Sequence, residues 1–191
     1  MKKSINIMIV GVGGQGTLLA SRLLGAVMIA EGMDVKVSEV HGMSQRGGSV
    51  VTYVKAGESV ASPVIEKGEA DLILAFEQLE AARWLPYLKK GGKIVVNTQK
   101  MDPMPVITGA AVYPEGILEK LMESDAVVTP VDALPLAVEA GSAKAVNVVL
   151  IGVLAAHMDF KKEVWLKAIQ QTVPEKFIDM NLKAFDAGYV Y

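Results

Sequence analysis

The residues whose spacing most clearly suggests chemistry form the glycine-rich stretch Gly11-Val12-Gly13-Gly14-Gln15-Gly16. It follows an apolar run at residues 5–10 and precedes residues 17–24, which have the composition of a helix. In a strand–turn–helix unit, glycines permit a tight turn and let a ligand approach the backbone. The first amides of such a helix have no intrahelical partner, so an anion such as a phosphate group could bind there. The same glycines are equally compatible with close packing of the strand against the helix and nothing more.

Two nucleotide-binding motifs can be compared with this loop. A P-loop requires Lys after the last glycine, whereas Thr17 stands there. A dinucleotide site requires an acidic residue at the end of the second strand, roughly 20 residues further along. Glu39 ends the predicted strand 33–39 and meets that requirement. The cofactor-binding set that this spacing predicts is Gly11, Gly13, Gly14, Gln15, Gly16 and Glu39.

A second polar loop lies between the predicted strands 33–39 and 49–54. Its residues are His41, Gly42, Met43, Ser44, Gln45, Arg46, Gly47 and Gly48. Gln45 and Arg46 offer several hydrogen-bond donors, and Arg can hold a carboxylate or phosphate bidentately. The loop therefore either contacts a partner or ligand, or is a solvated hairpin turn with Arg46 paired to a surface carboxylate. For His41 we expect a hydrogen bond to a backbone carbonyl.

Asn147 is a polar residue inside an otherwise apolar predicted helix at residues 145–158. A buried amide must be hydrogen-bonded. Asn147 is therefore expected to make a structural hydrogen bond, and tethering one of the two loops is one way to do so.

The composition limits the classes of function. A chain of 191 residues predicts one domain, residues 1–191. Hydrophobic residues make up 51% and the mean hydropathy is +0.35, which suggests that a partner covers apolar surface, a homodimer being one option for the isolated chain. The net charge of −2 indicates neither a nucleic-acid partner nor an anionic membrane. With no cysteine and two distant histidines, no cluster or metal site is expected.

The chain is expected to be cytoplasmic. Its longest apolar segment, residues 148–156, is far shorter than the ~20 residues that span a bilayer. The basic start followed by apolar residues imitates a signal peptide, but Asn6 interrupts the apolar run.

The alternation of β and α patterns predicts an α/β fold. Strands are expected at residues 5–10, 33–39, 49–54, 70–76, 93–97 and 126–128, with a short further strand at 106–107. Helices are expected at residues 15–31, 77–88, 115–122, 130–140, 145–158, 160–170 and 172–184. Gly91 and Gly92 should end the helix 77–88, and the Thr172–Glu175 spacing predicts a capping box.

No helix fits between the second and third predicted strands, so an antiparallel hairpin is expected there. The remaining order predicts a three-layer α/β/α, Rossmann-like domain with a mainly parallel sheet.

The combination of motifs resembles one family. Its elements here are the glycine loop, the run Gly42-Met43-Ser44-Gln45-Arg46-Gly47-Gly48, the Glu-containing helix after residues 70–76, and Lys144-Ala145-Val146-Asn147. They are similar to the gamma-type subunit or domain of 2-oxoacid:ferredoxin oxidoreductases, and within it most similar to the small, beta-designated subunit of the indolepyruvate-oxidising members. The resemblance spans essentially the whole chain, and the run at residues 42–48 is its most specific part.

The resemblance implies a CoA-dependent oxidative decarboxylation of a 2-oxoacid, with electrons passed to ferredoxin. Thiamine diphosphate and the iron–sulfur clusters are then expected on a larger partner subunit, since this chain lacks a Gly-Asp-Gly motif and cysteines. An accessory role follows, with no catalytic residue and no metal on this chain. The loop at residues 41–48 would lie at the subunit interface near the partner's thiamine site, or hold part of coenzyme A.

Two other classes of protein are compatible with parts of the sequence. An independent NAD(P)-dependent dehydrogenase would explain the glycine loop and Glu39. However, none of the five tyrosines has the lysine four positions later that short-chain dehydrogenases use. A non-enzymatic nucleotide-binding scaffold would instead predict a stable homo-oligomer without a larger catalytic partner.

Overall fold

The structure is a computed structural model and describes residues 4–40 and 47–191. The described strands are β1 (Ile5–Val12), β2 (Asp34–Val40), β3 (Ser49–Gly57), β4 (Ala70–Ala75), β5 (Leu88–Asn97) and β6 (Val127–Val131). The α-helices are α1 (Thr17–Ala30), α2 (Gln78–Trp84), α3 (Met104–Ile107), α4 (Ile117–Met122), α5 (Ala133–Ala140), α6 (Val146–Ala156), α7 (Lys162–Thr172) and α8 (Ile178–Tyr189). Short 3₁₀ segments are η2 (Leu85–Tyr87), η3 (Ala143–Ala145) and η4 (Glu175–Phe177).

The strands form one mixed sheet in the order β2-β3-β1-β4-β5-β6. The pairs β1–β4, β4–β5 and β5–β6 are parallel, whereas β3 is antiparallel to both β1 and β2. The predicted hairpin of the second and third strands and the mainly parallel sheet are therefore confirmed. The register places β3 between β1 and β2, with Ile5 opposite Ala56 and Val35 opposite the same Ala56 on its other side.

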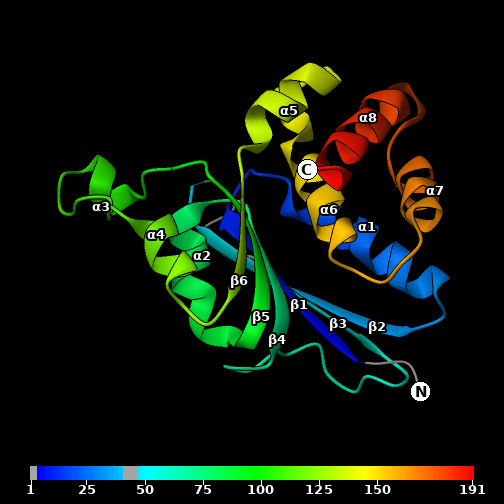
Figure 1. The fold of residues 1–191 in the computed structure, drawn as a ribbon, viewed down its shortest axis with the longest axis horizontal. Coiled ribbons are helices and arrows are strands. Elements are labelled where there is room, and N and C mark those ends of the chain that lie inside the picture. Colours follow the sequence, from blue (N-terminus) through cyan, green and yellow to red (C-terminus); the bar gives the residue numbers. More distant parts are fainter. Residues whose placement is uncertain (1–3, 41–46) are drawn as a thin grey trace.

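Helices cover both faces of the sheet, which confirms the three layers (Figure 1). On one face, α1 and α5 to α8 bury a large core in which Ile7 and Ile9 of β1 meet α1 and α6. On the other face, Met8 and Val10 of the same strand meet α2 and α4. Alternate residues of a strand point to opposite faces, so the continuous apolar run of β1 serves both cores.

Helix α6 is buried almost completely, as its all-round apolar sequence predicts. It packs against α8, and two glycines allow the close approach. A Cβ atom at Gly152 would lie 2.2 Å from the Phe185 carbonyl oxygen, and one at Gly188 would lie 2.0 Å from that of Val149. Only glycine at both positions permits this helix spacing.

Several predicted boundaries are wrong. Residues 106–107 belong to the short helix α3, whose first turn accommodates Pro105 because the first amides of a helix need no intrahelical acceptor. The helix predicted at 77–88 ends at Trp84, before the 3₁₀ turn that contains Pro86. Gly91 and Gly92 lie inside β5, where the register against β4 shifts between Ala70 and Leu72.

The C-terminal region also differs from expectation in detail. Thr172 is the last residue of α7 and does not cap the helix that follows. Pro174 precedes the 3₁₀ segment η4, and α8 then runs to Tyr189 rather than to residue 184. Helix α1 begins at Thr17 because Gly16 takes the left-handed conformation that precedes it.

Candidate functional site at the carboxyl edge of the sheet

The glycine loop lies where β1 ends and α1 begins. Gly14 and Gly16 have positive φ values of 102° and 87°, a backbone conformation that glycine adopts without strain. The side chain of Gln15 holds the loop in place. Its Oε1 accepts a hydrogen bond from the Val12 amide at 2.7 Å, and its Nε2 donates to the Phe76 carbonyl at 3.1 Å. In this structure Gln15 therefore ties the loop to the end of β4.

The glycine loop is joined to the end of the second loop. The Gly13 amide donates to the Gly48 carbonyl at 2.9 Å, and the Gly47 amide donates to the Gly13 carbonyl at 3.3 Å. Gly47 has a φ of 78°. The other predicted residues of this loop, His41, Gly42, Met43, Ser44, Gln45 and Arg46, lie outside the described residues. The described end of the second loop, Gly47 and Gly48, thus lies against the glycine loop.

Asn147 reaches the same region from the start of α6. It is 7% exposed, and its Nδ2 donates to the Gly16 carbonyl oxygen at 3.4 Å. A Cβ atom at Gly16 would lie 2.6 Å from the Asn147 Nδ2, so a larger residue at position 16 would displace this side chain. Of the two loops, Asn147 thus tethers the glycine loop.

A groove of about 340 Å³ runs along the start of α1. It is lined by Gly13, Gly14, Gly16, Thr17 and Leu18 on one side and by Val40, Val50, Val51 and Thr52 on the other. Within the described residues, the amides of Gly14, Gly16 and Thr17 have no hydrogen-bond acceptor. The groove therefore combines apolar walls with backbone donors at a helix N-terminus.

Glu39 lies beside α1 and not in the position of a dinucleotide-binding acid. Its Oε1 accepts a hydrogen bond from the Ser21 hydroxyl of α1 at 2.8 Å. In a dinucleotide fold the acidic residue ends the strand next to the first strand. Here β3 separates β2 from β1. This arrangement disfavours the stand-alone dehydrogenase.

Two buried glutamates at the start of α2 complete this edge; the sequence drew attention to a Glu-containing helix here but predicted neither glutamate as a site residue. Glu80 is 4% exposed and accepts hydrogen bonds from the Ser49 hydroxyl, from Trp84 Nε1 at 3.3 Å and from Arg83 Nε at 3.1 Å. Because Ser49 directly follows the second loop, Glu80 anchors that loop to α2. The signal in the sequence was an acidic residue in the first turn of a helix that follows a buried strand.

Glu77 is the second of these glutamates and is 1% exposed. Its Oε2 caps α2 by accepting from the Glu80 amide at 3.0 Å. Its Oε1 accepts from the Met101 amide at 3.3 Å and from the Tyr113 hydroxyl. Burial, and then the hydrogen bond to Glu77, raise the pKa of the Tyr113 hydroxyl above its usual value. The Tyr113 hydroxyl therefore keeps its proton and donates a hydrogen bond to Glu77.

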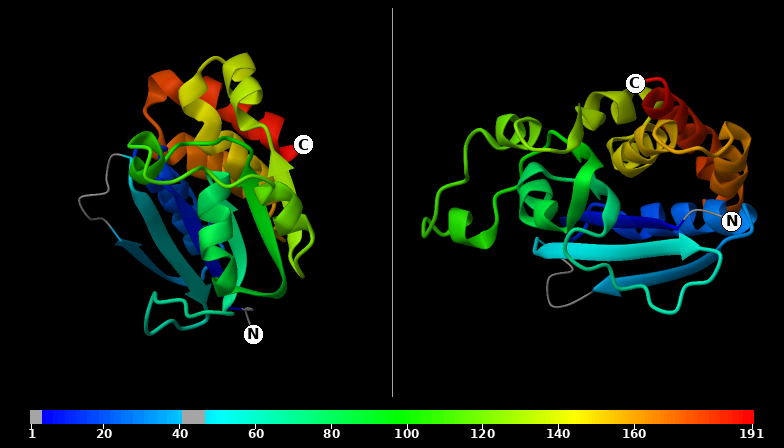
Figure 2. Two further views of the ribbon diagram at one scale, coloured as in Figure 1. Left: turned by 90° about the vertical axis from the view of Figure 1, so that its left-hand side faces the viewer. Right: turned by 60° about the horizontal axis from the view of Figure 1, so that its bottom comes forward.

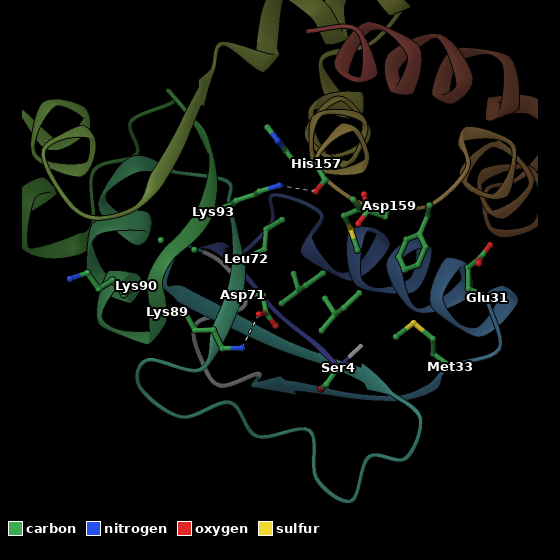
Figure 3. A pocket seen from close by; sticks show the side chains of 16 residues that line it. Ser4, Glu31, Met33, Asp71, Leu72, Lys89, Lys90, Lys93, His157 and Asp159 are labelled. Atoms are coloured by element: carbon green, nitrogen blue, oxygen red, sulfur yellow. Dashed lines mark hydrogen bonds and ion pairs between the residues drawn. The ribbon is translucent and has the colours of Figure 1, made fainter. Parts of the chain in front are cut away.

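A second pocket lies at the opposite, amino edge of the sheet (Figure 3). It has a volume of about 540 Å³ and an apolar wall that includes Leu72 and Met33. At its rim, Lys93 Nζ donates to the His157 carbonyl at 3.1 Å, and Lys89 Nζ lies 2.8 Å from Asp71 Oδ1. Burial and the charge of Lys93 lower the pKa of His157, so its imidazole favours the neutral form. None of the predicted site residues that the structure describes lines this pocket.

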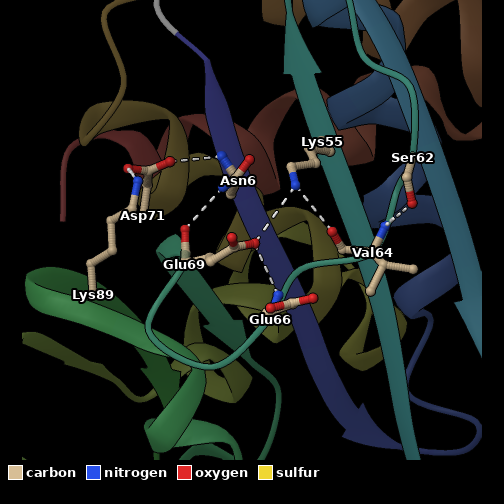
Figure 4. Close-up of polar contacts among 8 residues, drawn as sticks. All are labelled: Asn6, Lys55, Ser62, Val64, Glu66, Glu69, Asp71 and Lys89. Atoms are coloured by element: carbon tan, nitrogen blue, oxygen red, sulfur yellow. Dashed lines mark hydrogen bonds and ion pairs between the residues drawn. The ribbon is translucent and has the colours of Figure 1, made fainter.

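Polar contacts beside this pocket serve to hold the chain together (Figure 4). Asp71 Oδ2 accepts from the Asn6 amide at 2.8 Å, and Asn6 Nδ2 donates to the Glu69 carbonyl at 3.0 Å. Lys55 Nζ donates to the Val64 carbonyl at 3.1 Å and lies 3.7 Å from Glu69 Oε2. These contacts connect β1 and β3 to β4 and to the segment before it.

Metal binding and membrane insertion find no support in the part of the chain that the structure describes. No group of His, Cys, Asp and Glu residues in that part could hold a metal ion. No helix there is both long and apolar enough to cross a bilayer.

The fold and the two joined loops define a Rossmann-like α/β protein whose candidate site is an open edge rather than an enclosed active site. The chain belongs to the pyruvate ferredoxin/flavodoxin oxidoreductase family, whose model matches residues 6–191. The family resemblance found in the sequence is therefore confirmed.

Individual relatives agree with this assignment. The chain is 45% identical over 191 residues to the indolepyruvate oxidoreductase subunit IorB of Thermococcus kodakarensis, covering 97% of this chain and 95% of that protein. The keto/oxoacid ferredoxin oxidoreductase gamma subunit of Geobacter sulfurreducens has a similar structure, with a TM-score of 0.73, 25% identity, and coverage of 97% of this chain and 96% of that one.

The same fold also occurs inside a longer chain. The 2-oxoglutarate:ferredoxin oxidoreductase of Magnetococcus marinus, solved with 2-oxoglutarate, coenzyme A and succinyl-CoA bound, matches with a TM-score of 0.74 and 21% identity. The match covers 100% of this chain and 31% of that one.

Proposed function

We propose that this chain is the small, accessory subunit of an indolepyruvate-type 2-oxoacid:ferredoxin oxidoreductase. The complex would oxidatively decarboxylate a 2-oxoacid to an acyl-CoA and pass the electrons to ferredoxin. The observation that carries this proposal is the 45% identity to an indolepyruvate oxidoreductase subunit over nearly the full length of both chains.

An accessory role rests on the residue types that the reaction needs. Electron transfer to ferredoxin uses iron–sulfur clusters, which are held mainly by cysteine thiolates. The sequence contains no cysteine, so under this proposal another subunit holds the clusters. We assign the clusters and thiamine diphosphate to a larger partner subunit. We also assign the complex of that subunit and this chain to the cytoplasm. The cofactor would supply the chemistry, while this chain would supply binding surface.

The glycine-loop edge is the part of this chain that we assign to the reaction. The groove along α1 offers the amides of Gly14, Gly16 and Thr17, which suit a phosphate group of coenzyme A. The second loop adds His41, Gln45 and Arg46 from the sequence, and Arg46 would bind either a phosphate or a carboxylate of the partner. Glu80 and Asn147 would fix the two loops for this contact.

Affinity purification tests the proposal. The tagged chain is purified anaerobically from its native host, and the products are examined by mass spectrometry, iron assay and thiamine diphosphate assay. We expect a larger chain, rich in cysteine and carrying thiamine diphosphate and iron, in fixed stoichiometry with this one. Recovery of a homo-oligomer alone would support the scaffold alternative and contradict the proposal.

A further inference from the structure

An arm formed by residues 101–116, which includes α3, extends away from the sheet between β5 and α4. Figure 2 shows it beyond the edge of the sheet on the side where β2 ends and β3 begins, the edge of the glycine loop. None of its side chains is buried. The arm is therefore positioned by its attachment to the domain and not by a core of its own.

The root of the arm is fixed by the start of α2. Glu77 Oε1 accepts hydrogen bonds from the Met101 amide and the Tyr113 hydroxyl, so one buried oxygen holds both ends together. Just before the arm, the Gln99 carbonyl accepts from the Gln78 amide at 3.3 Å. Inside the arm, the Val106 and Ile107 amides both donate to the Pro103 carbonyl. The arm is thus a loop whose two ends are held together by Glu77 and which has hydrogen bonds of its own.

The tip of the arm presents apolar residues to solvent. Met104, Ile107 and Val112 are 61%, 66% and 87% exposed. Residues 103–112 contain no charged side chain. An ordered segment that exposes apolar groups without covering charges is typical of a binding surface. Its partner must offer an apolar and uncharged recess.

We propose that this arm docks into the larger subunit of the oxidoreductase complex, an inference that rests on the proposed function. In the Magnetococcus enzyme the same fold is part of a chain about three times as long, whereas the match to IorB of Thermococcus kodakarensis covers 95% of that protein. Under the proposed function, the larger subunit supplies the polypeptide that adjoins this fold in that longer chain. The arm stands at the edge that carries the glycine loop, so docking there would bring that loop to the same partner. A second copy of this chain is the competing occupant.

Cysteine labelling distinguishes the occupants, since the chain has no cysteine of its own. V112C places one thiol on the arm, and the matched control I29C places one on α1, where Ile29 is 64% exposed. Maleimide labelling of the small subunit is followed by intact mass, in isolation and in the anaerobic complex with the larger subunit. We expect V112C to react at least about tenfold more slowly in the complex and I29C to be unaffected. Equal reactivity of V112C in both states would overturn the proposal.

A substitution at the arm tests the contribution to affinity. I107D places a charge in the apolar contact, and I29D introduces the same charge at similar exposure outside it. We expect I107D to weaken binding to the larger subunit by at least about tenfold at an unchanged Tm, and I29D to bind like wild type. If I107D instead dissociates a homodimer of the isolated chain, the arm joins two copies and the docking proposal is wrong. If the wild-type chain binds no thiamine-carrying subunit, the proposed function itself fails.

Discussion

At the scale of single residues, the glycine loop is held by contacts that the sequence does not reveal. Asn147 is separated from Gly16 by 131 positions, yet it donates to its carbonyl oxygen. The sequence predicted that Asn147 needs a hydrogen bond but left its partner open. The spacing of Gln15 within the loop gave no sign that its side chain reaches the Phe76 carbonyl of β4. Such partners depend on tertiary packing and not on local pattern.

Gly16→Ala tests the contact between the glycine loop and Asn147. We expect a loss of unfolding free energy greater than the ~1–2 kcal/mol that the left-handed conformation costs an alanine. The excess arises because the new Cβ would lie 2.6 Å from the Asn147 Nδ2. Urea denaturation monitored by circular dichroism measures the free energy of unfolding of the wild type and of the variant.

Gly14→Ala is the matched control for this substitution. Gly14 also has a positive φ, 102°, but a Cβ atom there would meet nothing within 4 Å. It should therefore show the conformational cost alone. Equal losses for Gly14→Ala and Gly16→Ala would mean that the contact with Asn147 has no energetic role.

His157 is expected to make the protein less stable at mildly acidic pH. Burial and the neighbouring Lys93 lower its pKa in the folded state below the ordinary value of 6.5. The unfolded chain then binds a proton more readily, so unfolding free energy falls as the pH drops below about 6.5. His157→Gln should remove this part of the pH dependence, as measured by urea titrations between about pH 7 and pH 5. An unchanged slope in the variant would show that His157 titrates normally.

At the scale of elements, most of the fold followed from sequence patterns. The alternation of β and α segments and the short connection between residues 39 and 49 predicted the parallel sheet with one hairpin, and both were found. The order of the strands was not predictable in this way. Placement of β3 between β1 and β2 depends on cross-strand pairs such as Val10 with Val51, which are far apart in the sequence.

The predicted helix boundaries were wrong where a glycine and a proline both indicate the end of a helix. Gly91 and Gly92 suggested the end of a helix, but Pro86 had already ended it. The two glycines instead accommodate a register shift within β5. The arm was missed as an element because its root depends on Glu77, which lies 24 positions before Met101 and 36 before Tyr113.

The pairing of α6 with α8 should be highly sensitive to added volume. Gly188→Ala would place a Cβ atom 2.0 Å from the Val149 carbonyl oxygen, and backbone atoms cannot move aside individually. We expect a loss of at least about 3 kcal/mol of unfolding free energy, the upper end of the usual cost of overpacking. Thermal and urea unfolding provide the measurement.

Gly25 of α1 provides the control for that variant. It is buried in a helix, but an added Cβ would meet nothing within 4 Å. Gly25→Ala should be neutral or stabilising by about 0.5–1 kcal/mol, because alanine restricts the unfolded chain and favours helix. If both substitutions prove equally harmless, the close contact of α6 and α8 is not required for stability.

At the scale of the whole molecule, the two edges of the sheet differ in character. The amino edge holds a pocket of about 540 Å³, an ion pair between the neighbouring strands β4 and β5, and an ion pair between β3 and the segment before β4. The carboxyl edge holds the glycine loop, the buried glutamates of α2 and the apolar arm. The motifs found in the sequence mark the carboxyl edge. This asymmetry fits a chain that contributes one edge to a larger assembly.

Under the proposed function, this chain is one part of an enzyme and cannot catalyse the reaction alone. The most direct test measures 2-oxoacid oxidation anaerobically with indolepyruvate, coenzyme A, thiamine diphosphate and ferredoxin. The isolated chain should show no turnover above background, whereas the chain combined with its larger subunit should reduce ferredoxin in a coenzyme A-dependent reaction. Oxidation of the 2-oxoacid by the isolated chain would contradict the account.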